Sequence, residues 1–491
     1  MKIVRTGLIL TLLVLTAAFS QAADKPNIIL ILADDLGYGD VKALNPDSKI
    51  PTPALDKLAA DGLIFTDMHS PSSVCTPTRY GILTGRYNWR SSLKKGVLGG
   101  YSPALIEPER TTMASVLKGA GYHTAVIGKW HLGLNWAKLP SYDSAKSAYN
   151  PQDYGSGESE IDFSRPFTGG PLTLGFDDYF GISASLDMPP FTFLENDRVA
   201  EIPVTRKTWV REGTAAESFE AVDVLPKITE KAVRYIESRS GQAKQGKPFF
   251  LYFPLNAPHA PILPSPQWKG KSGINDYADF VMQTDDTVRQ IVTAVDKCGL
   301  AENTIIVFTS DNGCSPVAGI PQLREHGHDP SAGFRGAKAD IFEGGHRVPF
   351  IVRWPNHIKP QSSTGQLACL IDLIRTFAEI TGQQLSDNAA EDGVSLLSVW
   401  NETAVQPVRT EVIHHSINGS FAIRQGDWKL SLCPDSGGWS VPKPGSAQAK
   451  RLPEVQLYNL RSDTAETTNK QAEQSEVVQE LKLRLDKIIG K

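Results

Sequence analysis

The sequence predicts an α/β fold with a large, mostly parallel sheet sandwiched by helices and a smaller C-terminal antiparallel sheet plus helix. Over the first 382 residues, short apolar runs rich in β-formers alternate with longer segments at helical spacing. This alternation is typical of a parallel sheet covered on both faces. Beyond about residue 383 the runs become short strands that end in a polar helix. A length of 491 residues suffices for one large domain and a smaller partner.

The elements of the large part follow from apolar periodicity. Continuous apolar runs of the buried-strand type predict strands over 26–33, 122–127, 248–253, 304–309 and 348–352. Helical spacing of apolar residues predicts helices over 52–61, 111–120, 228–239, 277–297 and 372–381, the last ended by Gly382. Residues 135–225 are rich in Gly, Pro, Ser and aromatics, and we expect long inserted loops that shape a substrate mouth.

The C-terminal part changes character. Short strands are expected over 411–415, 420–424 and 428–432, with a polar helix over 474–489. The predicted organisation is therefore a signal peptide over 1–22, a catalytic domain over 23–382 and a small α+β subdomain over 383–491.

Composition excludes several classes of protein. Hydrophobic residues make up 41% and charged residues 21% of the chain, which is inconsistent with collagen, coiled coils or wholesale disorder. The net charge is −4, from 50 Lys and Arg against 54 Asp and Glu. No broad basic field is available, so we expect no binding of nucleic acid. An anionic substrate would have to be held by a local pocket.

The N-terminus resembles a secretory signal. Lys2 and Arg5 precede an apolar run over 8–19, which is too short to span a bilayer. Ser20 and Ala22 are small residues at the −3 and −1 positions of a cleavage site after residue 22. An uncleaved anchor is the alternative. We expect a periplasmic or extracellular (secreted) protein with no membrane span after cleavage. An odd number of cysteines leaves at least one unpaired, and the sequence does not settle the pairing of the others. The five are Cys75, Cys298, Cys314, Cys369 and Cys433.

Polar side chains follow four of the predicted strands. Ligands of open α/β sheets bind beyond the carboxyl ends of the strands, so we expect these side chains at one edge. They are Asp34 and Asp35, Lys129 and His131, Asn256 and His259, and Asp311 and Asn312.

The three carboxylates, Asp34, Asp35 and Asp311, and the amide of Asn312 offer only oxygen atoms as metal ligands. Such a set suits Ca²⁺ or Mg²⁺ and not Zn²⁺. Carboxylates this close repel one another unless a cation or protons neutralise them. A single Asp-Asp pair could instead be a cap or a turn, but two such pairs after two similar strands favour a metal site.

Cys75 stands in Cys75-Thr-Pro77-Thr-Arg79, followed by Leu-Thr-Gly-Arg86. A cysteine just before a helix could have its thiolate favoured by the helix dipole and by Arg79. A buried structural thiol or half of a disulfide is the alternative, and the cysteine taken alone favours it.

Six motifs in order resemble the type I sulfatases of the alkaline-phosphatase-like superfamily. The likeness runs from residue 26 to residue 460, and within the family the galactosamine-6-sulfatase and arylsulfatase A branches are the most similar. The motifs are Asp34-Asp-Leu-Gly-Tyr-Gly-Asp40, the Cys75 motif, Gly128-Lys-Trp-His-Leu-Gly, Pro258-His-Ala-Pro, Ser310-Asp-Asn-Gly, and Arg335-Gly-Ala-Lys338 leading to Glu343-Gly-Gly-His-Arg-Val-Pro349.

The resemblance implies that Cys75 is oxidised to Cα-formylglycine by a formylglycine-generating or anaerobic maturase enzyme. The aldehyde hydrates to a gem-diol, in which one hydroxyl attacks sulfur and the other allows sulfate to be expelled. An ordinary serine could be sulfated but could not release sulfate by that route.

The resemblance also assigns roles. One Ca²⁺ (Mg²⁺ is possible) would be held by Asp34, Asp35, Asp311, Asn312 and the modified Cys75. Arg79 would orient the hydrate, and Lys129 and Lys338 would clamp sulfate oxygens. His131 would take the proton that triggers sulfate release, and His259 would help protonate the leaving oxygen. His69 could line the pocket, and the remaining motif histidines are taken as loop residues: His326, His328 and His346.

The function expected is hydrolysis of sulfate monoesters on a carbohydrate, such as a sulfated glycan or glycosaminoglycan fragment. The alternatives are a phosphodiesterase or phosphonate hydrolase of the same superfamily and a non-catalytic binder of sulfated glycans. The sugar, the sulfated position, endo or exo action and the oligomeric state stay open. Aromatic residues of the long loops either stack on sugars or pack the loops: Trp136, Tyr154, Phe163, Phe191, Phe193 and Trp209.

Overall fold

The main sheet has ten strands in the computed structural model, which describes residues 25–147, 149–151 and 153–490. The predicted signal peptide over 1–22 lies outside the described residues. The strand order across the sheet is β13-β2-β12-β11-β1-β10-β4-β5-β6-β7. The strands are β1 (Asn27–Ala33), β2 (Leu63–Phe65), β4 (His123–Lys129), β5 (Asp178–Ile182), β6 (Leu194–Glu195), β7 (Arg198–Val199), β10 (Phe249–Pro254), β11 (Thr304–Ser310), β12 (Phe350–Arg353) and β13 (Ser362–Thr364).

The centre of the sheet is parallel. β11, β1, β10, β4 and β5 pair in parallel, with Ile29 of β1 level with Leu251 of β10 and Ile306 of β11. Their carboxyl ends therefore meet at one edge, as expected for ligand binding. β12, which corresponds to the predicted strand over 348–352, runs antiparallel to β11, so the sheet is mixed at this side.

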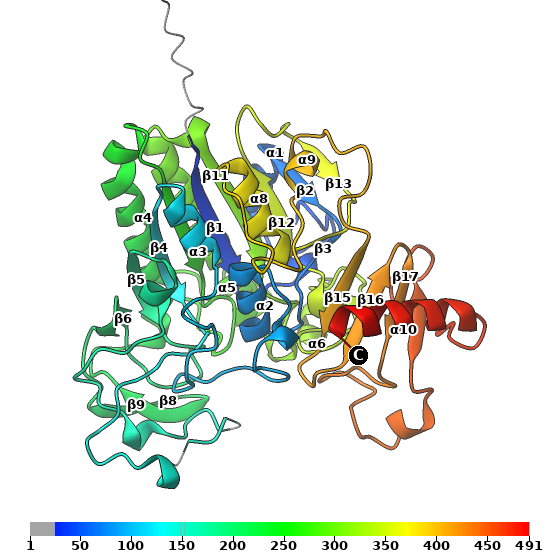
Figure 1. The fold of residues 1–491 in the computed structure, drawn as a ribbon, viewed down its shortest axis with the longest axis horizontal. Coiled ribbons are helices and arrows are strands. Elements are labelled where there is room, and N and C mark those ends of the chain that lie inside the picture. Colours follow the sequence, from blue (N-terminus) through cyan, green and yellow to red (C-terminus); the bar gives the residue numbers. More distant parts are fainter. Residues whose placement is uncertain (1–24, 148, 152, 491) are drawn as a thin grey trace, which may run out of the picture.

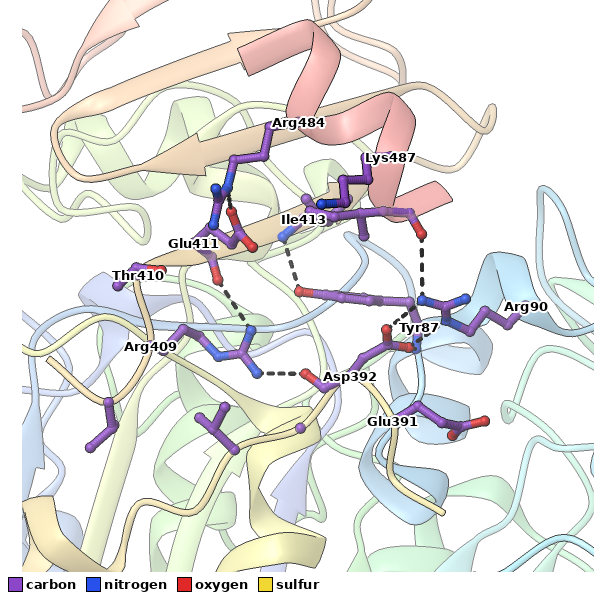
Figure 2. Close-up of a pocket in the computed structure, with 14 residues that line it drawn as sticks. Tyr87, Arg90, Glu391, Asp392, Arg409, Thr410, Glu411, Ile413, Arg484 and Lys487 are labelled. Atoms are coloured by element: carbon purple, nitrogen blue, oxygen red, sulfur yellow. Dashed lines mark hydrogen bonds and ion pairs between the residues drawn. The ribbon is translucent and has the colours of Figure 1, made fainter. Parts of the chain in front are cut away.

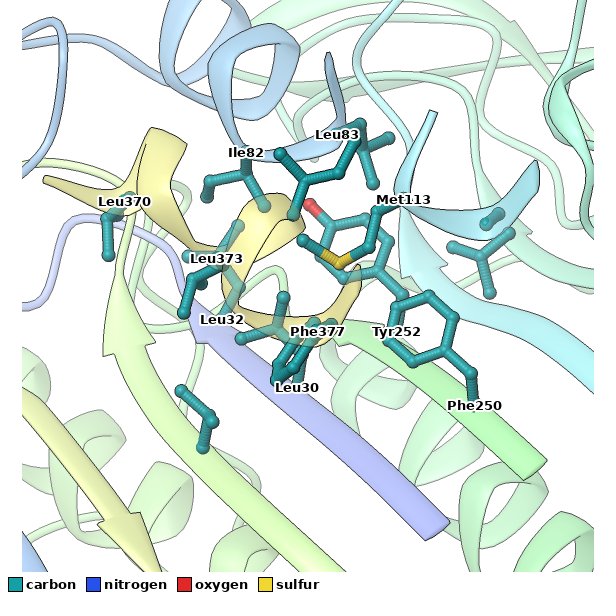
Figure 3. Packing of buried hydrophobic residues seen from close by; sticks show 14 of the residues in the cluster. Leu30, Leu32, Ile82, Leu83, Met113, Phe250, Tyr252, Leu370, Leu373 and Phe377 are labelled. Atoms are coloured by element: carbon teal, nitrogen blue, oxygen red, sulfur yellow. The ribbon is translucent and has the colours of Figure 1, made fainter. Parts of the chain in front are cut away.

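Helices cover both faces of the sheet (Figure 1). Because side chains alternate along a strand, Leu30 and Leu32 of β1 enter one core while Ile29 and Ile31 enter the other. Figure 3 shows Leu30 and Leu32 packed beneath three helices on the first face. Helices α2 (Cys75–Thr84), α3 (Met113–Gly119) and α8 (Leu373–Ile380) cover that face, and α1 (Pro53–Ala60), α4 (Val224–Ala243) and α5 (Asp276–Lys297) cover the other.

The end of the chain forms an antiparallel sheet with a helix against it, here called the C-terminal unit. It lies beside the main body in Figure 1. Its elements are β15 (Glu411–His415), β16 (Phe421–Gln425), β17 (Trp428–Ser431), β18 (Gln456–Asn459) and α10 (Ser475–Ile489). The fold class is thus confirmed, although β18 was not predicted.

Polar contacts fill the boundary between the main body and the C-terminal unit (Figure 2). The Tyr87 hydroxyl accepts a hydrogen bond from the Ile413 amide at 3.0 Å. The Arg90 guanidinium donates to both carboxylate oxygens of Asp392, at 2.8 and 2.7 Å. Arg484 of α10 pairs with Glu411 of β15 inside the unit.

The expectation of loops over 135–225 is only partly right. This region contributes β5 to the main sheet, and it contains a separate hairpin of β8 (Thr205–Trp209) and β9 (Arg211–Ala215). The remaining short elements are β3 (Met68–His69), β14 (Ala368–Cys369), α6 (Ile320–Glu325), α7 (Glu343–His346) and α9 (Leu397–Trp400). In the described part of the chain, no helix combines the length and the apolar character needed to cross a bilayer. All five cysteines have free thiols.

Candidate active site

Four strand ends bring their polar residues together at the carboxyl edge of the sheet. Ala33 of β1 is level with Ser310 of β11, so the residues that follow, Asp34 and Asp311, emerge side by side. Asp35 has a left-handed backbone (φ 66°), which turns the chain sharply after the strand. All three aspartates are buried, with at most 1% exposure.

The acidic residues and Asn312 contact one another directly. The Asn312 side-chain amide donates to Asp35 Oδ1 at 2.8 Å, and the Asp35 backbone amide approaches Asp311 Oδ1 at 3.3 Å. Four of the five residues predicted as metal ligands therefore lie together at this edge, and Cys75, the fifth, is described below.

Three buried cations surround these carboxylates. Lys129 Nζ lies 2.6 Å from Asp34 Oδ2, and Lys338 Nζ lies 2.6 Å from Asp35 Oδ1. Arg79 donates to Asp311 Oδ2 from Nε at 3.1 Å and from Nη2 at 2.8 Å. Three carboxylates thus face three cations in what we call the first charged cluster.

The electrostatics of the first charged cluster are uneven. Burial by itself would raise the pKa of Asp34, but Lys129 and the neighbouring cations hold it well below its usual range. For Asp311, burial and the negative charge of Asp34 outweigh Arg79 and raise the pKa to about 7. An additional positive charge nearby would therefore stabilise the ionised form of Asp311.

The unpartnered atoms of this cluster suit a hard cation. Asp34 Oδ1 and Asn312 Oδ1 are buried acceptors with no hydrogen-bond partner, and both side-chain atoms of Asn256 are also unpartnered. Ligand atoms of Asp34, Asp35 and His259 lie within 4.8 Å of one another. A buried oxygen without a donor is costly unless something absent from the protein chain satisfies it. Carboxylate and amide oxygens are the donors that Ca²⁺ and Mg²⁺ prefer.

Cys75 is the first residue of α2 and is 2% exposed. Burial raises the pKa of its thiol to about 11, against the attraction of Lys129 and Lys338. The thiolate is therefore not favoured at neutral pH, in line with the buried thiol that the cysteine taken alone favoured. Desolvation outweighs the attraction of the neighbouring cations here.

A cavity of about 460 Å³ opens on the cluster. Asp35, Cys75, His259 and Lys338 line it, so the predicted nucleophile, one acidic residue and two sulfate-binding candidates share one space. The His259 Nε2 atom lies 3.7 Å from Asp35 Oδ2.

His131 is completely buried behind this group and has a left-handed backbone (φ 57°). Its Nε2 lies 2.6 Å from the Leu98 carbonyl oxygen, which can only accept, so Nε2 carries the proton. Its Nδ1 has no partner and is left as a free acceptor. Burial and the charges of Lys129 and Arg79 hold the pKa of His131 well below its usual value.

His69 does not line the cavity. It belongs to a second charged cluster, formed by residues of the main body together with residues of the C-terminal unit. His69 Nε2 lies 2.8 Å from Asp67, and its Nδ1 lies 3.1 Å from His346 Nδ1. The second charged cluster consists of Asp67, His69, Glu343, His346, Arg347, His414, Arg424, Lys429 and Glu466.

The chain's own cations occupy the second charged cluster. Ligand atoms of His69, Glu343, His346 and His414 lie within 4.8 Å of one another, but Lys429 Nζ already lies between Glu343 and Glu466, at 3.1 and 2.9 Å, and 3.0 Å from His346 Nε2. The rings of His346 and His414 are stacked at 3.5 Å with planes 12° apart, so their in-plane lone pairs do not converge. Lysine and arginine side chains therefore balance the carboxylates of this group, while both ring nitrogens of His414 lack a hydrogen-bond partner.

The other motif histidines differ in environment. His346 is buried in α7, so its interpretation as a loop residue is wrong. His328 is also buried and contacts Asp40 at 2.8 Å, whereas His326 is exposed after α6.

Most loop aromatics pack one another instead of facing the cavity. Trp136 contacts Phe163, and Phe191 contacts Trp209, each edge to face. Only Tyr154 of the six candidates lines the cavity. The lining residues that sequence reasoning missed include Asp187, Arg211, Ile417 and Trp439. They come from the hairpin region and the C-terminal unit, and no local motif marks them.

Comparisons with known proteins agree with this geometry. The sulfatase family profile matches residues 26–383. The N-acetylgalactosamine-6-O-sulfatase of Bacteroides thetaiotaomicron is 33% identical over 95% of this chain and 94% of its own length. Arylsulfatase A of Bos taurus is 34% identical over 85% of this chain and 77% of its own.

A solved structure from the glycosaminoglycan metabolism of Bacteroides thetaiotaomicron, described as a 6S-sulf, has the same fold. Its TM-score is 0.81 at 31% identity, and the match covers 96% of this chain and all (100%) of that one.

Proposed function

This chain belongs to the sulfatase family and is a sulfuric ester hydrolase, and from that premise we propose that it hydrolyses a 6-sulfate on N-acetylgalactosamine or a similar sugar. The sugar is suggested by the relative named N-acetylgalactosamine-6-O-sulfatase, which aligns over nearly the whole chain. The observation that carries the proposal is the first charged cluster, which holds unpartnered acceptor oxygens and whose members Asp35 and Lys338 line a cavity together with Cys75.

Charge arithmetic supports an anionic substrate. Three carboxylates and three cations of the chain balance one another in the first charged cluster. A divalent ion bound to Asp34, Asp35, Asp311 and Asn312 would leave the site with an excess of about two positive charges. A sulfate monoester, which carries one negative charge, would be attracted to it.

A divalent ion held by Asp34, Asp35, Asp311 and Asn312 would supply Lewis acidity toward a sulfate oxygen and an attacking hydroxyl. Oxygen-only ligands favour Ca²⁺ or Mg²⁺ for this role.

The nucleophile is proposed to be Cys75 after its oxidation to Cα-formylglycine by a maturation enzyme. Its hydrated aldehyde supplies a hydroxyl for attack on sulfur. The high pKa of the buried thiol argues against unmodified cysteine in this role.

The remaining residues handle charge and protons. Lys129 and Lys338 meet the negative charge of sulfate oxygens in a water-poor site. Arg79 holds Asp311 and also donates to the Lys129 carbonyl at 3.0 Å, and so fixes the start of α2 against the strand ends. The free Nδ1 of His131 accepts a proton during sulfate release, and His259 protonates the leaving oxygen.

We also propose that residues 1–22 direct secretion to the periplasm or the exterior, and that 23–382 and 383–491 are the catalytic domain and the smaller subdomain. The contrast between the mixed sheet and the separate antiparallel sheet supports this division.

The test is turnover of 6-sulfated N-acetylgalactosamine by enzyme from a host that contains the maturation machinery. Cys75→Ala should abolish activity, with a loss of at least about 10³-fold. The control is Cys298→Ala, just after the end of α5, which should retain activity. Intact-mass analysis should find wild-type protein about 18 Da lighter than the unmodified chain. Activity in Cys75→Ala, or an equal rate on the matching phosphate ester, would overturn the proposal.

A further inference from the structure

The lining of the candidate active-site cavity combines buried polar residues with exposed apolar ones. Asp35, Cys75, His259 and Lys338 are at most 8% exposed. Three large hydrophobic lining residues face solvent: Val210 is 70%, Val317 is 61% and Trp439 is 45% exposed. Exposed apolar side chains around a concave site mark a surface that a ligand covers.

Trp439 is the lining aromatic with an open face. Tyr154, the other large aromatic in the lining, has the Arg211 guanidinium over its ring at 5.1 Å. Among the described residues, no aromatic or cationic side chain is recorded against the Trp439 indole. Indole faces stack well on the apolar faces of sugar rings.

The loop that carries Trp439 is fixed to the segment that carries Lys338. Asp340 Oδ1 accepts hydrogen bonds from the Trp439 and Ser440 amides, at 2.8 and 3.0 Å, and its Oδ2 accepts from the Ala337 amide at 2.9 Å. The Ile341 amide donates to the Ser436 carbonyl at 2.7 Å. Trp439 is therefore held at a set position relative to the Lys338 ammonium group.

Glycine at position 438 allows this close approach. A Cβ at that position would lie 2.3 Å from the Ala339 carbonyl oxygen, which no side chain tolerates without backbone movement. The loop from the C-terminal unit and the Lys338 turn are thus packed backbone to backbone.

We propose that Trp439 of the C-terminal unit is a specificity-determining residue that stacks on the pyranose ring bearing the sulfate. The proposal rests on the proposed function. A 6-sulfate hangs from an exocyclic methylene, so with the sulfate at the buried residues Lys338 and His259 the ring extends toward the exposed lining residues. The ligand recognised there is a pyranose with an apolar C–H face.

The experiment compares a ring-bearing probe with a ring-free one. For wild type and Trp439→Ala, KM and kcat are measured on 6-sulfated N-acetylgalactosamine, and the inhibition constant is measured for inorganic sulfate. Trp439→Ala should raise KM about tenfold with little change in kcat, because stacking is made equally in the ground and transition states. The inhibition constant for sulfate should change less than twofold.

Further variants separate stacking from folding. Trp439→Phe should keep KM within about threefold, whereas Trp439→Leu, which is apolar but has no aromatic face, should resemble Trp439→Ala. Leu483→Ala, an exposed (71%) residue of α10, is the matched control and should behave as wild type.

Three results would overturn the inference. An unchanged KM in Trp439→Ala would show that the indole does not contact the sugar. A parallel loss of sulfate affinity would show that the loop acts by holding Lys338. Phe and Leu variants of equal KM would exclude stacking. If wild type turned over no sulfated sugar, the proposed function would fail first, and this inference with it.

Discussion

The molecule contains two buried charged clusters of similar make-up, and they differ in which atoms lack partners. Each sets three carboxylates against three Lys or Arg cations. In the first cluster the atoms without a hydrogen-bond partner include the acceptor oxygens of Asp34 and Asn312, and Asp35 and Lys338 line the cavity that contains Cys75. In the second, Glu466 Oε1 and both ring nitrogens of His414 lack a hydrogen bond, but Lys429 Nζ lies 2.9 Å from that Glu466 oxygen. A pocket also reaches Asp67 and Arg424 of the second cluster. Charge balance and a neighbouring pocket therefore do not distinguish a binding site from a structural one; acceptor oxygens without a close cationic partner do.

The variant Asp34→Asn tests whether the first charged cluster is the binding site. We expect kcat/KM to fall by at least about 10³-fold, because one ligand oxygen of the proposed cation is lost. The midpoint of thermal unfolding should move little, and bound metal measured on the purified protein should fall in parallel. Near wild-type activity with normal metal content would remove Asp34 from the site.

The counterpart in the second charged cluster is Glu343→Gln. It leaves Lys429 and Arg347 short of a buried negative charge, so we expect destabilisation by about 3–5 kcal/mol in denaturant unfolding. Activity per folded molecule should stay within a few-fold of wild type. A selective loss of activity with full stability would mean that the second cluster also takes part in catalysis.

The next prediction concerns pH. Burial lowers the pKa values of His69, His346 and His414, and for His346 and His414 Lys429 and a neighbouring histidine lower them further. The unfolded chain therefore binds protons that the folded chain does not. The contribution of these histidines to the free energy of unfolding is therefore fully present above about pH 6.5. It falls as pH drops below that value, by up to about 1.4 kcal/mol per pH unit for each histidine.

The variant that tests this is His414→Gln. Its unfolding free energy, measured between pH 7.5 and 5.5, should fall less steeply than that of wild type by one histidine's share. Identical slopes for the two proteins would show that His414 is not a buried neutral group.

The smallest effect is expected where ions face water. The Arg90 side chain is 32% exposed, and its partner Asp392 keeps a hydrogen bond from the Tyr87 amide at 2.9 Å (Figure 2). Arg90→Ala should therefore cost about 1 kcal/mol or less. A loss comparable to that of Glu343→Gln would show that exposure is a poor guide to the strength of these pairs.

The apolar patterns of short segments predicted the buried strands and the polar residues at their ends, because these features depend on neighbouring residues in the sequence. The apolar run of β1 predicted a buried strand that ends in Asp34 and Asp35. Because β1 and β11 are parallel neighbours, these residues lie beside Asp311. The sequence left the state of the Cys75 thiol open between a stabilised thiolate and a buried thiol, because its desolvation comes from elements distant in the sequence. Trp439 could not be predicted for the same reason: its place in the cavity depends on how the C-terminal unit packs against the Lys338 turn.

β5 illustrates another limit. Asp178–Ile182 pairs with β4 at a point where the sequence shows only a short run between glycine-rich stretches. Strand pairing at the side of a large sheet is a tertiary effect that a short segment does not reveal.

The hydrogen bonds around Ser72 and Ser73 bear on the order of events in the life of the chain. The Ser72 hydroxyl and the Ser73 amide both donate to the His415 carbonyl, at 2.8 and 3.1 Å, so a residue made late in synthesis ties down the loop just before Cys75. Once these hydrogen bonds form, the thiol is 2% exposed and borders only the cavity, which a small substrate can enter but an enzyme cannot. An enzyme that has to bind the chain around this cysteine must therefore act while the newly made chain still lacks its last eighty or so residues or has not yet docked them.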